Sequence, residues 1–137
     1  ENLDGIMAWI NDSRLKNLSK PIELDVKIHH DIPGMYDAVF SSNTAHIMDI
    51  LGVQSMFQLV GDTLSNKGVF CLYGPFNVDG EYTSESNREF DLMLKSKNSE
   101  MGIRDIDQLK ELGIQNNLNL VRSYAMPSNN MIIVWEK

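Results

Sequence analysis

The apolar run VFCLY, residues 69–73, constrains the fold more than any other segment, because it has no polar face to turn toward solvent. A strand that is apolar on both faces is typical of the centre of a sheet with helices on both sides. The run stops at Gly74-Pro75, and a stretch rich in Ser, Glu, Asn and Asp follows. We therefore expect a central strand whose chain leaves the sheet directly after it.

Strand and helix patterns alternate along the rest of the chain. Strands are expected at 22–28, where apolar and polar residues alternate, and at 36–42, which is mostly apolar. Helical spacing predicts helices near the start of the chain and at 45–65, 84–97 and 105–113. Two closing strands, 117–126 and 131–137, are joined by the short segment PSNN and predict an antiparallel hairpin. This order predicts an α/β fold in which an antiparallel pair extends the sheet.

Two details of the helices are also predicted. Met56, Phe57, Val60 and Leu64 form one apolar stripe of the 45–65 helix, which Gly52 is expected to divide in two. In the 84–97 helix we expect Phe90, Met93 and Leu94 to point inward.

Composition narrows the possible partners. The chain has 137 residues, of which 42% are hydrophobic, so it is long enough to bury a core as one domain. Its net charge of -7 argues against a nucleic acid or an anionic membrane as the main partner. The sequence shows no membrane span and no signal peptide, and we expect a cytoplasmic protein. The lone Cys71 lies in the apolar run, which favours a buried, inert thiol.

The ends of three expected strands carry a carboxylate at Asp25, an amide at Asn43 and the aromatic break Tyr73-Gly74-Pro75-Phe76. Ligands of open α/β sheets bind beyond the carboxyl ends of the strands, which makes Asp25, Asn43 and His46 candidate site residues. His46 is suited to act as a general base, but it could equally bond to backbone at a helix end. Asp25 could accept hydrogen bonds from an adenine amino group, although the alternation of its strand also fits a solvated carboxylate.

Other polar residues allow two interpretations each. Arg104 could clamp a carboxylate or phosphate, or form a surface salt bridge with a neighbouring Asp. Asn129 and Asn130 could line a site, or simply serve the chemistry of a turn. His29 and His30 are adjacent and diverge on an extended backbone, so we expect no metal site. The sequence also has no nucleophile elbow, phosphate-binding loop or dinucleotide-binding glycine motif.

Six segments, taken in order, resemble one family. They are PIELDV, SSNTAHI, LYGPF, TSESNREFD, MGIRD and MPSNN, and they run from Pro21 to the end of the chain. Together they are similar to the family of methyltransferase-like protein 26, an uncharacterised group of class I methyltransferases that use S-adenosylmethionine. The resemblance implies a Rossmann-like sheet with a reversed closing hairpin, and S-adenosylmethionine bound across the strand ends.

The resemblance also implies roles for individual residues. Leu24, Asp25 and Val26 would flank the adenine of the cofactor, while Ser42 and Asn43 would lie beside its methionine part. His46 would be the proton acceptor. The acceptor substrate, which no motif names, would bind against a set of residues drawn from four segments: Tyr73, Gly74, Pro75, Phe76, Asn87, Asp91, Arg104, Asn129 and Asn130. In this interpretation Tyr73 and Phe76 wall the pocket, and residues 77–87 form a lid over it.

The sequence departs from the family at its start. The family begins with a strand, a glycine-rich turn and a second strand, and this sequence shows none of the three. Residues 1–137 are therefore expected to form the C-terminal major part of a single, N-terminally incomplete domain. The alternative to an enzyme is a non-catalytic scaffold module with the same fold. Unfilled strand edges invite association, so a homo-oligomer is a further expectation.

Overall fold

The structure is a computed structural model that describes residues 2–28, 32 and 34–137. The chain forms two compact units, Glu1–His30 and Asp31–Lys137, which are described separately. The first unit contains helix α1, Asn2–Ser13, at the position predicted for the start of the chain. No helix among the described residues is both long enough and apolar enough to span a membrane.

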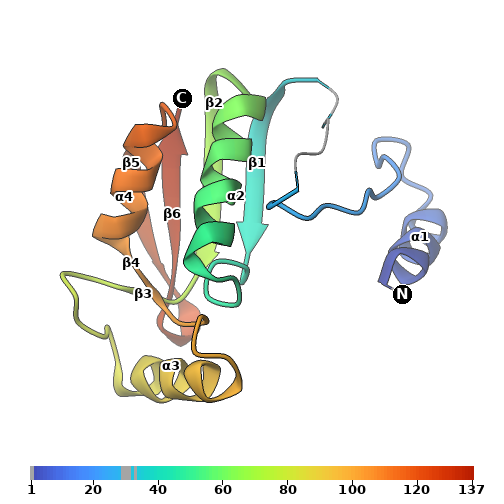
Figure 1. Ribbon diagram of the computed structural model, residues 1–137. Coiled ribbons are helices and arrows are strands. Elements are labelled where there is room, and N and C mark those ends of the chain that lie inside the picture. Colours follow the sequence, from blue (N-terminus) through green and yellow to red (C-terminus); the bar gives the residue numbers. More distant parts are fainter. Residues whose placement is uncertain (1, 29–31, 33) are drawn as a thin grey trace. The chain divides into compact units, whose positions relative to one another are not determined.

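The second unit is built on a four-stranded mixed sheet in the order β1-β2-β6-β5 (Figure 1). Strand β1, Tyr36–Ser42, runs parallel to β2, Leu64–Gly74. Strand β6, Asn130–Glu136, pairs antiparallel with both β2 and β5, Asn119–Met126. The closing hairpin turns through the short 3-10 helix η1, Pro127–Asn129. The predicted α/β sheet with an antiparallel C-terminal pair and a central 69–73 strand is confirmed.

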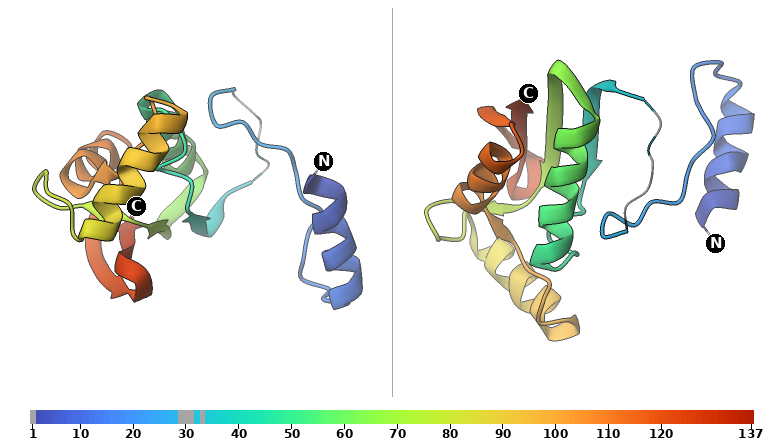
Figure 2. Two further views of the ribbon diagram at one scale, coloured as in Figure 1. Left: turned by 90° about the horizontal axis from the view of Figure 1, so that it is seen from below. Right: turned by 45° about the horizontal axis from the view of Figure 1, so that its top comes forward.

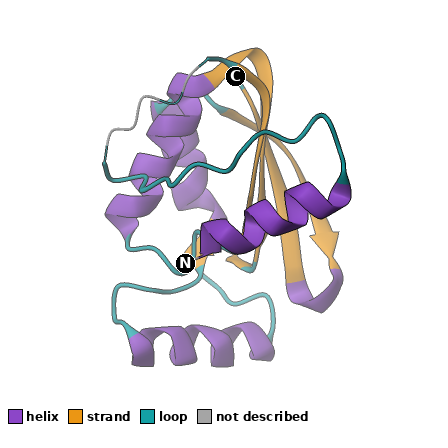
Figure 3. Cartoon of the chain, turned by 90° about the vertical axis from the view of Figure 1, so that its right-hand side faces the viewer, coloured by secondary structure: helices purple, strands orange, loops and turns teal. Residues whose placement is uncertain are grey.

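Helices α2, Ile50–Thr63, and α4, Ile106–Gln115, lie on the same face of this sheet (Figure 3). Helix α3, Glu85–Lys97, lies instead beyond the strand ends, as the view from below shows (Figure 2). The chain enters and leaves α3 through two short paired strands, β3, Phe76–Asn77, and β4, Arg104–Asp105. This arrangement places α3 over the carboxyl ends of β1 and β2.

Three aromatic rings form the centre of the core between sheet and helices. Phe57 of α2 meets Phe70 of β2 edge to face at 5.6 Å between ring centroids, and it meets Trp135 of β6 at 5.3 Å. Phe70 and Trp135 stack at 5.3 Å. All three rings are fully buried. The predicted apolar stripe of α2 is confirmed for Met56, Phe57 and Val60, which are buried; Leu64 is buried too, but as the first residue of β2.

Helix α2 is shorter than predicted and is not divided. Its N-cap is Asp49, whose Oδ1 accepts a hydrogen bond of 2.7 Å from the backbone N–H of Gly52. This cap fixes the start of the helix, so residues 45–48 form a turn rather than helix, and Gly52 sits in the first helical turn. In α3, Leu94 points inward as expected, but Met93 is 39% exposed.

The strand predicted at 22–28 does not form. The backbone N–H groups of Lys27 and Ile28 both bond to Asp25, at 3.0 Å each, which makes a turn. The side chains of Ile22, Leu24 and Ile28 are 61%, 41% and 59% exposed. A strand needs a neighbour to bond its backbone, and the described residues of the first unit include no strand. Alternation alone therefore predicted a strand that has no partner there.

The expectation of helices on both faces of the central strand is also wrong for the second unit. Phe70 and Leu72 are buried on the face that α2 and α4 cover, whereas Val69, Cys71 and Tyr73 on the other face are only half-buried. Phe40, paired with Cys71 on that second face, is 66% exposed. The helices of Asp31–Lys137 therefore leave one face of the sheet uncovered.

The aromatic core predicts a large difference between two substitutions of one residue. Trp135→Ala should lower the free energy of unfolding by about 3–5 kcal/mol, because it removes a fully buried ring. Trp135→Phe should cost far less, because it keeps a ring and deletes an indole N–H that has no hydrogen-bond partner among the described residues. Urea denaturation would measure both. Trp9→Ala is the control, since Trp9 is 77% exposed; a comparable loss there would contradict the assignment of the core.

Candidate functional site

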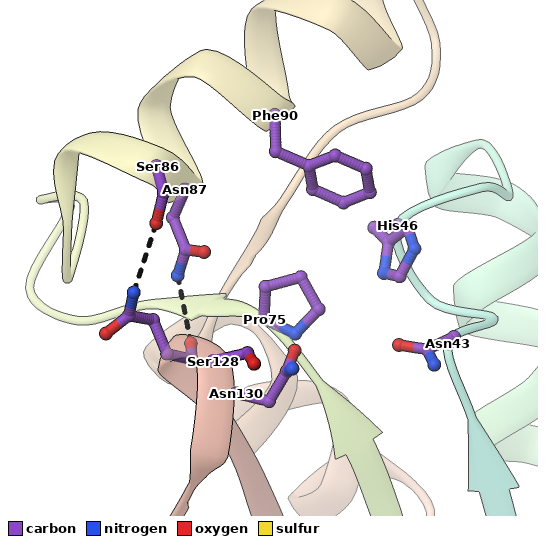
Figure 4. Close-up of a pocket in the computed structure, with 9 residues that line it drawn as sticks. Asn43, His46, Pro75, Ser86, Asn87, Phe90, Ser128 and Asn130 are labelled. Carbon is purple, nitrogen blue, oxygen red and sulfur yellow. Dashed lines mark hydrogen bonds between the residues drawn. The ribbon is translucent and has the colours of Figure 1, made fainter.

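A hollow of about 490 Å³ lies beyond the carboxyl ends of β1 and β2 (Figure 4). Its volume is within the range typical of small-molecule sites. Four segments meet there: the turn after β1, the chain just after β2, the start of α3 and the tip of the closing hairpin. The lining residues are Asn43, His46, Pro75, Ser86, Asn87, Phe90, Ser128, Asn129 and Asn130.

The end of β1 places two polar side chains in the hollow. Asn43 has a left-handed backbone with φ 57°, a conformation that Asn tolerates well, and its N–H bonds to the carbonyl of Tyr73 at 2.9 Å. The chain therefore turns sharply away from the sheet while still tied to β2. A Cβ on Gly74 would lie 3.7 Å from His46 Nδ1 and 3.8 Å from Asn43 Oδ1, so these two side chains converge over that glycine.

His46 is held in place by its backbone and by one ring. Its carbonyl accepts a hydrogen bond of 3.0 Å from the N–H of Gly102, and its imidazole meets Phe90 edge to face at 5.3 Å. Only 6% of the residue is exposed, and neither ring nitrogen is hydrogen-bonded within the described part of the chain. Burial, together with the positive charge of Arg104, lowers the pKa of His46 below 6.5. The imidazole is therefore neutral near pH 7 and can accept a proton.

Side-chain hydrogen bonds join α3 to the hairpin tip. The amide of Asn87, itself buried, donates to the hydroxyl of Thr83 at 2.9 Å and to the carbonyl of Asn129 at 3.1 Å. The amide of Asn129 donates in turn to the Ser86 hydroxyl at 3.0 Å. Both Asn87 and Ser86 lie in the first turns of α3, which Ser84 caps. Two distant segments thus form one continuous wall of the hollow.

Two predicted site residues lie outside the lining. Asp91, 1% exposed, accepts hydrogen bonds from Tyr82 at 2.7 Å, Lys95 at 2.6 Å and the backbone N–H of Ile103 at 2.7 Å. The guanidinium of Arg104 donates to the carbonyls of Ala45, at 3.2 Å, and of Met48 and Glu100. Both charges are used to join segments of the backbone to one another rather than to face the hollow.

The four residues of the segment YGPF, Tyr73 to Phe76, lie in different parts of the structure. Pro75 lines the hollow, and Gly74 lies next to the side chains of Asn43 and His46. Phe76 is 1% exposed in the core, and Tyr73 lies on the uncovered face of the sheet, paired with Ser42 and Ile132. Neither aromatic is among the lining residues. The aromatic wall is Phe90, three residues after Asn87 on the same face of α3.

The remaining predicted residues are placed as follows. Asn129 and Asn130 line the hollow from the hairpin tip. Leu24, Asp25 and Val26 belong to the first unit, and Asp25 caps its own turn there. Sequence reasoning did not single out Ser86 and Phe90, although their spacing to Asn87 was an available signal for both.

No set of three or more His, Cys, Asp or Glu side chains among the described residues is arranged to hold a metal ion. His29, His30 and Asp31, the trio weighed for metal binding from the sequence, lie outside the described residues.

The lowered pKa of His46 predicts how stability depends on pH. Because the unfolded chain binds a proton near 6.5 and the folded chain binds it only at lower pH, acidification below about 6.5 favours unfolding. His46→Gln removes this contribution. When the pH is lowered from about 7.5 to about 5.5, the urea midpoint should therefore fall more in the wild type than in the variant. The other two histidines are common to both proteins, and an equal fall would contradict a depressed pKa.

The hydrogen bonds of Asp91 predict that replacing this one carboxylate with an amide destabilises the fold strongly. Burial raises the pKa of Asp91, but hydrogen bonds from Lys95, Tyr82 and the Ile103 N–H outweigh burial and lower it, so the carboxylate is charged at neutral pH. Asp91→Asn should cost about 2–3 kcal/mol in unfolding free energy, because an amide cannot satisfy these donors. Glu89→Gln, at an exposed position on the same helix, should change it by less than about 0.5 kcal/mol. Equal losses would exclude the proposed hydrogen-bonding role.

Solved structures share this fold at low sequence identity. An O-methyltransferase family protein from Burkholderia thailandensis matches with TM-score 0.83 and 11% identity, over 98% of this chain and 40% of that one. The mitomycin 7-O-methyltransferase MmcR matches with TM-score 0.80 and 13% identity, over 98% and 39%. NcsB1, an O-methyltransferase from neocarzinostatin biosynthesis, was solved with S-adenosylmethionine and 2-hydroxy-5-methyl naphthoic acid. It matches with TM-score 0.77 and 14% identity, over 97% and 38%.

These likenesses show that the fold is the α/β sheet of class I methyltransferases. The chain spans about two-fifths of the length of the structures it matches. In sequence, residues 1–137 match the family described as "Protein of unknown function (DUF938)" over their whole extent. The chain therefore belongs to the DUF938 family.

Proposed function

We propose that this chain is part of an S-adenosylmethionine-dependent methyltransferase and that its acceptor substrate binds in the hollow beyond β1 and β2. The fold supports the proposal, because its structural neighbours include proteins named as O-methyltransferases, one of them solved with S-adenosylmethionine. The observation that carries it is His46, a buried neutral imidazole at the strand ends with neither ring nitrogen bonded within the described chain. Such a group can take a proton from a hydroxyl as it is methylated.

The residues at the strand ends fit a small polar cofactor. Gly74 has no side chain at the point where those of Asn43 and His46 converge, and the left-handed turn at Asn43 follows directly after Ser42. We assign Ser42 and Asn43 to the methionine part of the cofactor. When bound, S-adenosylmethionine supplies an electrophilic methyl group, so the protein needs mainly to align the reactants and exclude water.

The described residues divide that work between them. His46 holds the proton that the acceptor releases. Phe90 and Pro75 provide apolar surface that displaces water, while the amides of Asn43, Asn87 and Asn130 orient the acceptor. Arg104 and Asp91 act indirectly, because they join the backbone segments around His46 and α3. Tyr73 and Phe76 support the site from the sheet and the core.

We further propose that the methyltransferase-like protein 26 family includes relatives of this chain. Four of the six segments that carry the resemblance, SSNTAHI, LYGPF, TSESNREFD and MPSNN, supply the turn after β1, the end of β2, the start of α3 and the hairpin tip, which together form the hollow. The acceptor is expected to be a small molecule rather than a nucleic acid, because the net charge is -7.

A second candidate function is a non-catalytic scaffold that associates through the sheet. Within the described residues β1 pairs only with β2, so one of its edges is open, and Phe40 on the uncovered face is 66% exposed. Open edges and apolar faces favour association, including with a second copy of the chain. This candidate does not require the polar hollow.

The enzymatic proposal predicts separate effects on binding and on transfer. S-adenosylhomocysteine, titrated calorimetrically into the wild type and into His46→Gln, should bind both with affinities within about twofold. With catechol as the probe acceptor, kcat for labelled methyl transfer should fall about 10²- to 10⁴-fold in His46→Gln. Unchanged transfer by the variant would remove His46 as the base. No binding of S-adenosylhomocysteine by either protein would contradict the methyltransferase proposal and favour the scaffold.

A further inference from the structure

We propose that the hollow selects an uncharged, hydroxylated acceptor with a planar ring, and discriminates against acceptors that carry either sign of charge. This inference rests on the proposed function, since it names the substrate class of the same site. It follows from the chemical types of the nine lining side chains and from the bonds that the charged groups around them already form.

The lining contains no Lys, Arg, Asp or Glu. Four of its side chains are amides, two are hydroxyls, and the rest are an imidazole, a phenyl ring and a proline ring. Amides and hydroxyls both donate and accept hydrogen bonds, so they recognise neutral polar groups without preferring one charge. A charged acceptor would lose its hydration on entering and would meet no counter-ion among the residues that line the site.

The charges nearest the lining are already paired within the protein. Arg104 donates to three backbone carbonyls, and Asp91 accepts from three donors, one of them the ammonium of Lys95. On the outer side of α3, Arg88 pairs with Glu85 through both its Nε and an Nη atom. Redirecting Arg104 or Asp91 toward a ligand would break bonds that connect the segments around the site, and the solvent-exposed Arg88 and Glu85 are not among the lining residues. The fixed charges therefore cannot serve as counter-ions.

The neutral His46 completes this picture. Burial disfavours its imidazolium form, and the positive Arg104 does so as well, so His46 provides no cation for an anionic acceptor. As a neutral base it suits a hydroxyl, which loses a proton only as the new bond forms.

The arrangement of the lining indicates a flat molecule. Figure 4 shows Asn43 and His46 on one side of Pro75, with Ser86 and Asn87 on the other. The rings of Phe90 and Pro75 provide the apolar surface between these two polar walls. A planar ring can pack on this apolar surface while its substituents reach the amides on either side.

Three phenols that differ in one substituent test the proposal. They are 4-hydroxybenzamide, 4-hydroxybenzoate and 4-hydroxybenzylamine, which are neutral, anionic and cationic at neutral pH. Each is titrated into the chain without any methyl donor, and binding is followed by NMR of the side-chain amides of Asn43, Asn87 and Asn130. We expect the neutral amide to bind about tenfold more tightly than either charged compound.

A charge placed in the hollow should reverse the selection. Asn130 is extended at φ -89°, and among the described residues its side chain forms one bond, of 3.4 Å to the Pro127 carbonyl, so it is replaceable. Asn130→Lys should raise the affinity for 4-hydroxybenzoate about tenfold, and Asn130→Asp should do the same for 4-hydroxybenzylamine. Gln58→Lys, in a separate hollow between α2 and α4, is the control and should leave the order of affinities unchanged.

Each outcome bears on the proposal independently of methyl transfer. Tighter binding of a charged phenol by the wild type would overturn it, and so would the absence of binding by all three compounds. A reversal in Gln58→Lys as large as that in Asn130→Lys would assign the effect to net charge and overturn it as well. Failure of S-adenosylhomocysteine to bind contradicts only the methyltransferase proposal, because these titrations include no cofactor.

Discussion

The parallel pairing of β1 with β2 is the constraint on which the candidate site depends. Parallel strands end at the same edge of a sheet, so the register Ser42 to Tyr73 brings the turn at Asn43 beside Gly74. The hydrogen bond from the Asn43 N–H to the Tyr73 carbonyl extends that register by one residue beyond the sheet. Without this register, the positions of His46 and Pro75 would not be fixed relative to each other. The aromatic core around Phe57 and Trp135 holds this register indirectly, by packing α2 against the sheet.

Arg104 and Asp91 are two charged side chains that connect segments of the chain to one another. Arg104 fixes the turn that carries His46, and Asp91 fixes the return from α3 to β4. Backbone groups in a loop have no hydrogen-bond partners from a helix or sheet, and each of these side chains supplies such partners instead. The surface of the hollow is left to neutral groups. Charged residues thus hold the fold together, while neutral residues a few positions away in the sequence line the hollow.

The sequence predicted the parts of this structure that depend on local pattern. The run at 69–73, the 36–42 strand and the closing hairpin all follow from apolar periodicity and turn residues, and the structure confirms them. The strand at 22–28 failed because a strand also needs a partner, which periodicity cannot reveal. Of the YGPF segment, pattern gave the break in the chain but not the face on which each aromatic would lie. Arg104 and Asp91 were predicted to line the substrate pocket, and a sequence pattern could not show that their charges are bonded within the protein instead.

The link between α3 and the hairpin tip has a consequence for how the site is assembled. The bond from Asn129 to Ser86 joins residues 43 positions apart, and the bond from Asn87 to the Asn129 carbonyl spans 42 positions. Contacts of such long sequence separation form late, because the chain between them must first be ordered. During synthesis, α3 emerges well before the hairpin that completes its wall. The hollow is therefore a property of the finished fold, closed only when the last two strands are in place.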